Sequence, residues 1–276
     1  MTVTATSTTV VLDPRRNVPG TRPGFGSTLR SEWIKFWSVR STAWATAMLF
    51  VLGAGLTVLV CALNAEWLGS GEADESPGSF ITFGMTFAQI TAIVLGTLAV
   101  TREYGTGMIR ATLAATPRRG PVLAAKALVL SGTLFVAGTV TAFAGYLAGN
   151  WFLDREGVGL ALSDEGVLRS MVGSGLYMAG LGLLAAAVGI LVRHTAAALS
   201  TVLALVFVVG NMAFLLPGAW GEWTAKLMPG NAGSPVAAPV SFNPELMAPW
   251  TGFAVFAAEV AVLMTVGWLV FQRRDA

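Results

Sequence analysis

The sequence predicts an all-α, polytopic integral membrane protein with six transmembrane helices. Of the 276 residues, 54% are hydrophobic and 12% are charged, whereas a soluble domain has about 25% charged residues. Six apolar stretches approach the roughly 20 residues that a helix needs to cross a bilayer. The lysines and arginines are concentrated on one side of these stretches. Composition, length and charge pattern therefore indicate the same class.

The six predicted spans are apolar stretches separated by charged or proline-containing segments. They cover approximately residues 43–64, 80–100, 122–149, 168–192, 195–217 and 250–271. Lys126 stands near the start of the third span, where its long side chain can reach the membrane surface. The fourth and fifth spans meet at "VRHTA", which leaves room only for a tight helical hairpin.

The N-terminal segment, residues 1–26, contains three prolines and many threonines, without a periodic apolar pattern. It is expected to be a disordered tail. The first apolar span starts too far from the N-terminus, and is too long, for a cleaved signal peptide. We therefore interpret that span as a membrane anchor, and residues 27–276 as one six-span membrane domain.

An amphipathic helix is predicted just before the first span, in "STLRSEWIKFWSVRSTAW". Apolar side chains near helical spacing share one face, while polar side chains lie largely off it. The apolar set is Leu29, Trp33, Phe36, Trp37 and Trp44, and the polar set is Arg30, Glu32, Lys35 and Ser38. Such a helix lies in the membrane interface. The alternative is an aromatic belt without a separate helix.

The orientation follows from the basic residues, because cytoplasmic loops are enriched in Lys and Arg. Fourteen of the 17 basic residues precede the first span, separate spans two and three, lie in the turn between spans four and five, or follow the last span. The opposite side has only Arg155, Arg169 and Lys226. The prediction is a multi-pass protein of the cell membrane with both termini cytoplasmic.

Several chemistries are excluded by missing residues. None of the three lysines follows a glycine, so the phosphate-binding G-x-x-x-x-G-K-[ST] loop is absent. His194 is the only histidine and Cys61 the only cysteine, so one chain cannot form a histidine-based triad, a multi-histidine metal site or an internal disulfide. The chain also lacks the catalytic residues that an intramembrane enzyme would need. We expect no enzymatic activity, no metal, no bound cofactor and no nucleic-acid partner.

Glu259 is the one acidic residue placed well inside a predicted span. A charged acid near the bilayer centre costs roughly 2.5–3.5 kcal/mol on insertion scales. Glu259 is therefore a possible intramembrane polar site, either on a substrate path or linked to protons. The alternative, which the isolation of this residue favours, is a structural acid that is neutral or hydrogen-bonded to another helix.

A polar stretch, "TREYGTGMIRATLAATPRRGPVLAAK", connects spans two and three. Gly105 and Gly107 disfavour a continuous helix. The following residues predict a short amphipathic helix that ends before Pro117, and Pro121 suits the first turn of the next span. The alternative is a basic loop that only enforces topology.

This stretch resembles the cytoplasmic loop of bacterial ATP-binding cassette (ABC) type-2 exporter permeases. The resemblance rests on an acid, an aromatic, a Gly-Thr pair, a basic residue, then a leucine and a proline before a lysine. The six-span plan and the amphipathic entry helix extend it to most of the chain. A difference is Gly107, a second glycine between Thr106 and Met108.

The resemblance implies that the stretch forms a coupling helix against a separate ABC ATPase subunit, which would bind the ATP. The residues carried over to that interface are Glu103, Tyr104, Gly105, Thr106, Ile109, Arg110, Leu113 and Pro117. It also implies a second permease subunit, identical or different, so that residues 27–276 would be a permease domain.

The segment 218–249 before the last span contains Pro229, Pro235, Pro239, Pro244 and Pro249, which forbid one long helix. Short re-entrant or interfacial helices occupy this place in the family, and the alternative is a plain extracellular loop.

The function expected is a permease subunit of an ABC exporter. The alternative function is a secondary, ion-coupled transporter, which normally shows more polar groups within its spans. The sequence leaves the substrate open.

Overall fold

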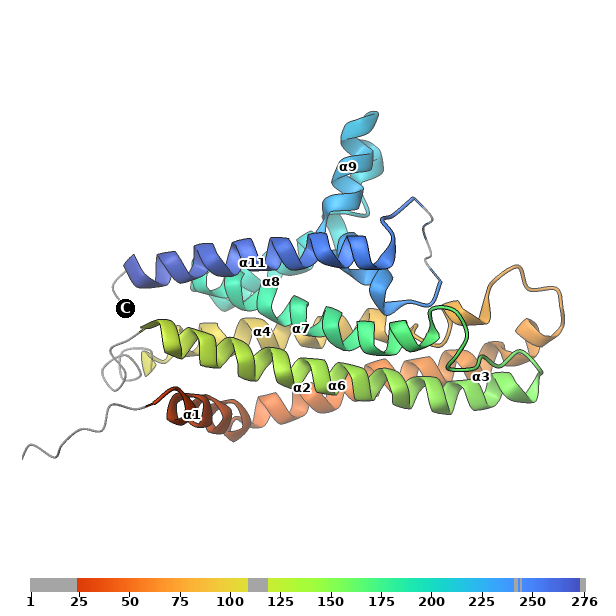
Figure 1. The fold of residues 1–276 in the computed structure, drawn as a ribbon, viewed down its shortest axis with the longest axis horizontal. Coiled ribbons are helices and arrows are strands. Elements are labelled where there is room, and N and C mark those ends of the chain that lie inside the picture. The colour runs from red at the N-terminus through yellow and green to blue at the C-terminus, as the bar shows by residue number, and fades with distance from the viewer. Residues whose placement is uncertain (1–23, 109–118, 241–242, 244, 274–276) are drawn as a thin grey trace, which may run out of the picture.

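The computed structural model describes residues 24–108, 119–240, 243 and 245–273, and these residues form helices without any β-strand. Five helices are long and apolar enough to cross a membrane: Arg40–Gly69, Met85–Gly105, Gly120–Arg155, Val167–Val192 and Pro249–Arg273. They run side by side along the long axis of the molecule (Figure 1). The predicted all-α, membrane-spanning class is confirmed at this level.

Helix α1 (Phe25–Ser38) is separate from the first membrane-spanning helix. Val39 has an extended backbone (φ −93°, ψ 118°), so the chain changes direction there. The spanning helix then continues from α2 (Arg40–Phe50) through a π-helical turn, η1 (Val51–Gly55), into α3 (Leu56–Gly69). Trp33 is half exposed while Glu32 is buried, so α1 directs its indole outward and its carboxylate inward. Residues 1–23, most of the predicted tail, lie outside the described residues.

The centre of the bundle is α7 (Val167–Val192), which contacts α4 (Met85–Gly105), α6 (Arg119–Arg155) and α11 (Pro249–Arg273). In Figure 1, α7 lies between α11 and α6. Small residues allow the close approach of α4 and α7, because a Cβ added at Gly96 would lie 2.2 Å from the carbonyl oxygen of Gly182. Helices α4, α6 and α7 match the predicted spans 80–100, 122–149 and 168–192, and their ends are displaced from the predicted ones by up to about two helical turns.

The predicted span 195–217 differs from the structure. The helix starts as α8 (Thr195–Leu203), becomes a π-helix, η3 (Ala204–Val209), and continues only to a short 3-10 turn, η4 (Ala213–Leu215). The apolar helix Thr195–Val209 is thus shorter than the roughly 20 residues that cross a bilayer. Leu216 is extended before Pro217, as expected for a residue that precedes proline. The six-span count is therefore not reproduced among the described residues, in which five long helices are joined by this shorter one.

Three short helices follow in the segment before α11. They are α9 (Ala219–Leu227), α10 (Pro229–Gly233) and the 3-10 turn η5 (Ser234–Ala237). Pro229 and Pro235 stand in the first turns of α10 and η5, where the missing N–H has no helical partner to lose. The predicted interruption of this segment by prolines is confirmed. Helix α9 stands away from the bundle (Figure 1), and Trp220 and Trp223 on it are exposed.

Candidate functional site

The polar stretch 101–126 begins within the last turn of α4 and ends in α6. Thr106 follows α4 as its C-cap, and Gly107 has a left-handed backbone (φ 69°) that favours glycine. The predicted coupling helix would start after this turn. Four of its predicted interface residues lie outside the described residues: Ile109, Arg110, Leu113 and Pro117.

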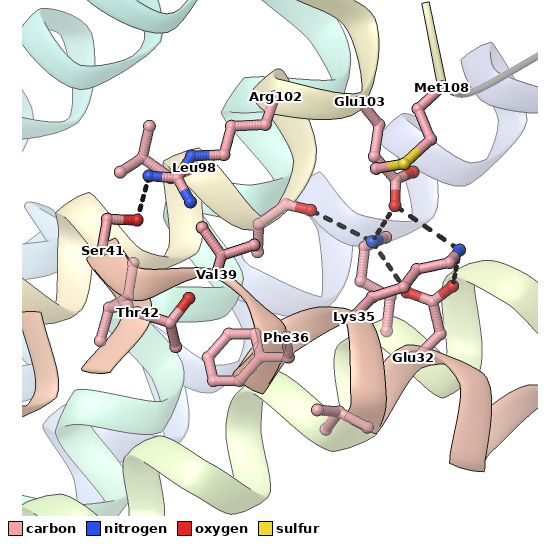
Figure 2. Close-up of a pocket in the computed structure, with 14 residues that line it drawn as sticks. Glu32, Lys35, Phe36, Val39, Ser41, Thr42, Leu98, Arg102, Glu103 and Met108 are labelled. Atoms are coloured by element: carbon pink, nitrogen blue, oxygen red, sulfur yellow. Dashed lines mark hydrogen bonds and ion pairs between the residues drawn. The ribbon is translucent and has the colours of Figure 1, made fainter. Parts of the chain in front are cut away.

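Both ends of the stretch contribute to a buried ionic cluster, which consists of Glu32, Lys35, Glu103 and Lys126 (Figure 2). Lys126 Nζ lies 2.8 Å from Glu103 Oε1 and 2.8 Å from Glu32 Oε2. Lys35 Nζ lies 2.6 Å from Glu32 Oε1 and 3.8 Å from Glu103 Oε1. Two ammonium groups therefore share two carboxylates.

Each member of the ionic cluster comes from a defined helical position. Glu32 and Lys35 are three residues apart on α1, so they share one face. Glu103 is in the last turn of α4, and Lys126 is in the second turn of α6. Lys126 also donates to the carbonyl oxygen of Ala99, at 3.1 Å. The cluster thus connects α1 with α4 and α6, the two helices that border the polar stretch.

Burial makes these contacts consequential for stability. The side chains of Glu32 and Glu103 are only 4% and 6% exposed, and that of Lys126 is 13% exposed. Removing one partner from a buried ion pair leaves a charge without its partner, at a typical cost of about 3–5 kcal/mol. The two carboxylates hold the Lys126 side chain between the helices.

The ionization of Glu32 reflects two opposing effects. Burial pushes the pKa of its carboxyl upward, but the charge and hydrogen bond of Lys126, together with those of Lys35, bring that pKa below its usual range. Glu32 is therefore a carboxylate at neutral pH. It gains a proton only below the pH range in which an ordinary glutamate does.

A second contact ties α4 to the start of α2. Arg102 Nη2 donates a hydrogen bond to the hydroxyl oxygen of Ser41 (Figure 2). A small cavity of about 70 Å³ lies between this contact and the ionic cluster, with Phe36 and Met108 among its lining residues. The chain on both sides of the break at Val39 is thus fastened to the last turn of α4.

The same turn of α4 is linked to the hairpin between α7 and α8. The guanidinium of Arg193 lies 5.0 Å from the ring centroid of Tyr104, within the range of a cation–π contact. Thr195 Oγ1 donates to Thr101 Oγ1 at 2.9 Å. His194 accepts the N–H of Ala197 through Nδ1 at 3.3 Å, which caps α8. The single histidine therefore has a structural role here.

The structure separates the predicted interface residues that it describes into two groups. Glu103 and Tyr104 contact other helices of this chain, whereas Gly105 and Thr106 are exposed. Sequence reasoning did not identify Glu32 as a second carboxylate that shares Lys126 with Glu103. An available signal was that Glu32 is the one acid of a helix otherwise rich in aromatic and basic residues.

Glu259, the other predicted polar site, lies on α11 and is partly buried. Its Oε2 atom has no hydrogen-bond partner among the described residues. Among all the residues that the structure describes, no group of three or more His, Cys, Asp or Glu side chains could hold a metal ion.

A scan against protein-family models and a search of curated proteins found no match to this chain.

Proposed function

We propose that this chain is the membrane-spanning permease subunit of an ABC exporter. In this proposal it forms the substrate pathway, and a separate ATPase subunit supplies the energy by hydrolysing ATP. The chain itself is not an enzyme. The observation that carries the proposal is the ionic cluster, because it connects α1, the end of α4 and the start of α6 on both sides of the polar stretch.

The cluster supports a mechanical role for the polar stretch. A partner that displaces residues 106–118 would pull on Glu103 at one end and on Lys126 at the other. Since Lys126 contacts Glu103 and Glu32 at 2.8 Å, α4, α6 and α1 would move together. A loop that only enforced topology would need the charges of this stretch and none of these specific contacts.

The assembly follows from the same proposal. Two permease subunits, identical or related, would enclose a pathway in the lipid bilayer, and two ATPase subunits would dock against their polar stretches. The end of the bundle that contains the ionic cluster would face the cytoplasm, because eight of the described basic residues belong to this end by their position along the chain: Arg30, Lys35, Arg40, Arg102, Arg119, Lys126, Arg193 and Arg273. The location is then the cell membrane, with both termini cytoplasmic.

A secondary transporter driven by an ion gradient is the second candidate. It is favoured by Glu259, since an intramembrane carboxyl group whose Oε2 has no hydrogen-bond partner among the described residues is a possible proton site. A single such group is weak support, because ion-coupled transporters normally have several polar groups around interrupted helices.

The test is co-expression of the chain with a candidate ABC ATPase subunit, followed by co-purification and measurement of ATP hydrolysis in liposomes. We expect a stable complex that hydrolyses ATP, whereas the chain alone does not. Steady ATP hydrolysis by the chain alone would refute the permease assignment. Substrate flux driven by a proton gradient, without any ATPase, would support the second candidate instead.

A further inference from the structure

A cavity of about 310 Å³ lies in the other half of the bundle, between α4, α7, η3 and the short helices α10 and η5. Gln89 and Glu103 are on the same helix, 14 residues apart. At 1.5 Å per residue this places the cavity about 21 Å along α4 from the ionic cluster. The cavity is therefore distinct from the site described above.

The lining of this cavity combines polar and apolar side chains, and no Asp, Glu, Lys, Arg or His is among its lining residues. The polar side chains include Thr86, Gln89, Tyr177, Asn231 and Ser234. The apolar part includes Met85, Met178, Phe207 and Leu246. The volume reaches the lower end of the range typical of small-molecule sites, about 300–1,000 Å³.

Two of the polar side chains are already held in place by the protein. The buried Tyr177 hydroxyl donates to Gln89 Oε1 at 3.0 Å, and Gln89 Nε2 donates to the carbonyl oxygen of Thr86 at 2.8 Å. These bonds fix the wall formed by α4 and α7. They give the cavity a preformed shape, which lowers the cost of ordering it around a ligand.

Three other side chains have hydrogen-bonding capacity to spare. Within the described part of the chain, the side chains of Thr86, Asn231 and Ser234 make no hydrogen bond. Thr86 is exposed and Asn231 and Ser234 are half-buried, so an amide and two hydroxyl groups in the lining can form hydrogen bonds with water or with a ligand. All three are neutral, so they match hydroxyl, amide or ether groups of a ligand.

We infer that this cavity binds an uncharged molecule that carries both hydroxyl or amide groups and an apolar portion. A charged ligand would find no opposite charge in the lining, and it would lose its hydration on entry. Arg169 is not among the lining residues, although its guanidinium donates to the carbonyl oxygens of Ala238, which does line the cavity, and of Pro239, each at 3.0 Å.

The experiment measures protection of a cysteine introduced into the cavity. Ala238→Cys is made in the full-length chain, and its reaction with a small uncharged methanethiosulfonate is followed in proteoliposomes. The wild-type chain supplies the background, because its single Cys61 is fully buried. Three probes share one six-carbon tail and differ in their head group: hexyl β-glucoside, hexyl sulfate and hexyltrimethylammonium.

We expect hexyl glucoside to slow the labelling of Ala238→Cys by about fivefold or more, and the two charged probes to change it by less than about twofold. Asn231→Leu should raise the protecting concentration about tenfold, as should Thr86→Val. Thr265→Val on the exposed face of α11 is the matched control and should have no effect. Ser163→Cys, in an exposed loop, should label at the same rate with every probe.

Three results would overturn the assignment. Protection by hexyl sulfate alone would indicate an anion site that uses Arg169. Equal protection by all three probes would indicate an apolar cavity without head-group recognition, and absence of protection would show that the cavity binds none of them. Ser234→Ala, the smallest change, replaces Asn231→Leu if that variant does not fold. Binding here needs no ATPase, so its outcome is independent of the proposed ATP-driven function.

Discussion

Replacing Lys126 by methionine should destabilise the chain more than any other single lysine substitution. The substitution keeps a long apolar stem but removes the ammonium that contacts Glu32 and Glu103, each at 2.8 Å. At an effective dielectric constant of about 20, each contact has a gross Coulomb attraction of roughly 6 kcal/mol, most of which offsets the desolvation of the charges. Breaking a buried pair costs about 3–5 kcal/mol net, which we expect as the loss for Lys126→Met.

The assay is reversible unfolding of the purified chain in detergent micelles, combined with hydrogen exchange of α1. Lys226→Met is the control, because Lys226 on α9 forms no ion pair with a described residue. Lys35→Met should cost only about 1 kcal/mol, since its side chain is 28% exposed. Adding Glu103→Gln to Lys126→Met should recover part of the loss, because one uncompensated carboxylate disappears.

The reasoning fails if Lys126→Met costs no more than Lys226→Met. It also fails if the effects of Lys126→Met and Glu103→Gln simply add, because residues in direct contact should show a coupling energy of about 0.5–3 kcal/mol. A further requirement is that faster hydrogen exchange appears in α1, since that helix is held to α4 and α6 through Glu32. Faster exchange confined to α6 would contradict the proposed connection.

Three further predictions concern topology, pH and partner docking. A cysteine at Ser76 should react with an impermeant thiol reagent from outside sealed cells and one at Thr116 should not, and labelling of Thr116 from outside would reverse the orientation. The stabilisation by Glu32 should be complete above its ordinary pKa near 4.5 and disappear as pH falls through its lowered native pKa. The free energy of unfolding should therefore depend less on pH in this acidic range in Glu32→Gln than in the unchanged protein. Leu113→Asp should weaken binding of the ATPase subunit about thirtyfold, equivalent to roughly 2 kcal/mol, while membrane insertion stays normal. Glu103→Lys should do so as well, with an added loss of stability from the ionic cluster, and normal docking and transport in both variants would eliminate the coupling-helix proposal.

Most of the fold could be predicted because apolar length is a local property of the sequence. The stretch 168–192 became α7, Val167–Val192, almost without change. The stretch 195–217 was equally apolar but did not become one regular helix. Its π-helical turn, Ala204–Val209, and the extended residue Leu216 before Pro217 shorten it. Apolar content does not distinguish these backbone states, so the fifth predicted span, 195–217, could not be told from a regular helix.

The candidate site could be predicted only in part. Glu103 was named only as one of the interface residues that the family resemblance implies, and its ion-pair partner within the chain was not predicted. The identity of that partner depends on how α4 packs against α6, which joins residues 23 positions apart. Lys126 contacts Glu32 across an even larger separation along the chain. Contacts of this kind arise from tertiary packing, and no local pattern encodes them.

The equal number of positive and negative groups in the ionic cluster has a consequence for the energetics of any movement at this site. Transferring one elementary charge across a membrane potential of 100 mV involves about 2.3 kcal/mol of electrical work. Glu32 and Glu103 contribute two negative charges, and Lys35 and Lys126 contribute two positive ones. When the four groups move together, the work on the cations cancels the work on the anions. The ionic cluster itself therefore adds no net electrical work when α1, α4 and α6 are displaced as one unit, and the membrane voltage acts only on the other charges of these helices, such as Arg30 and Arg102.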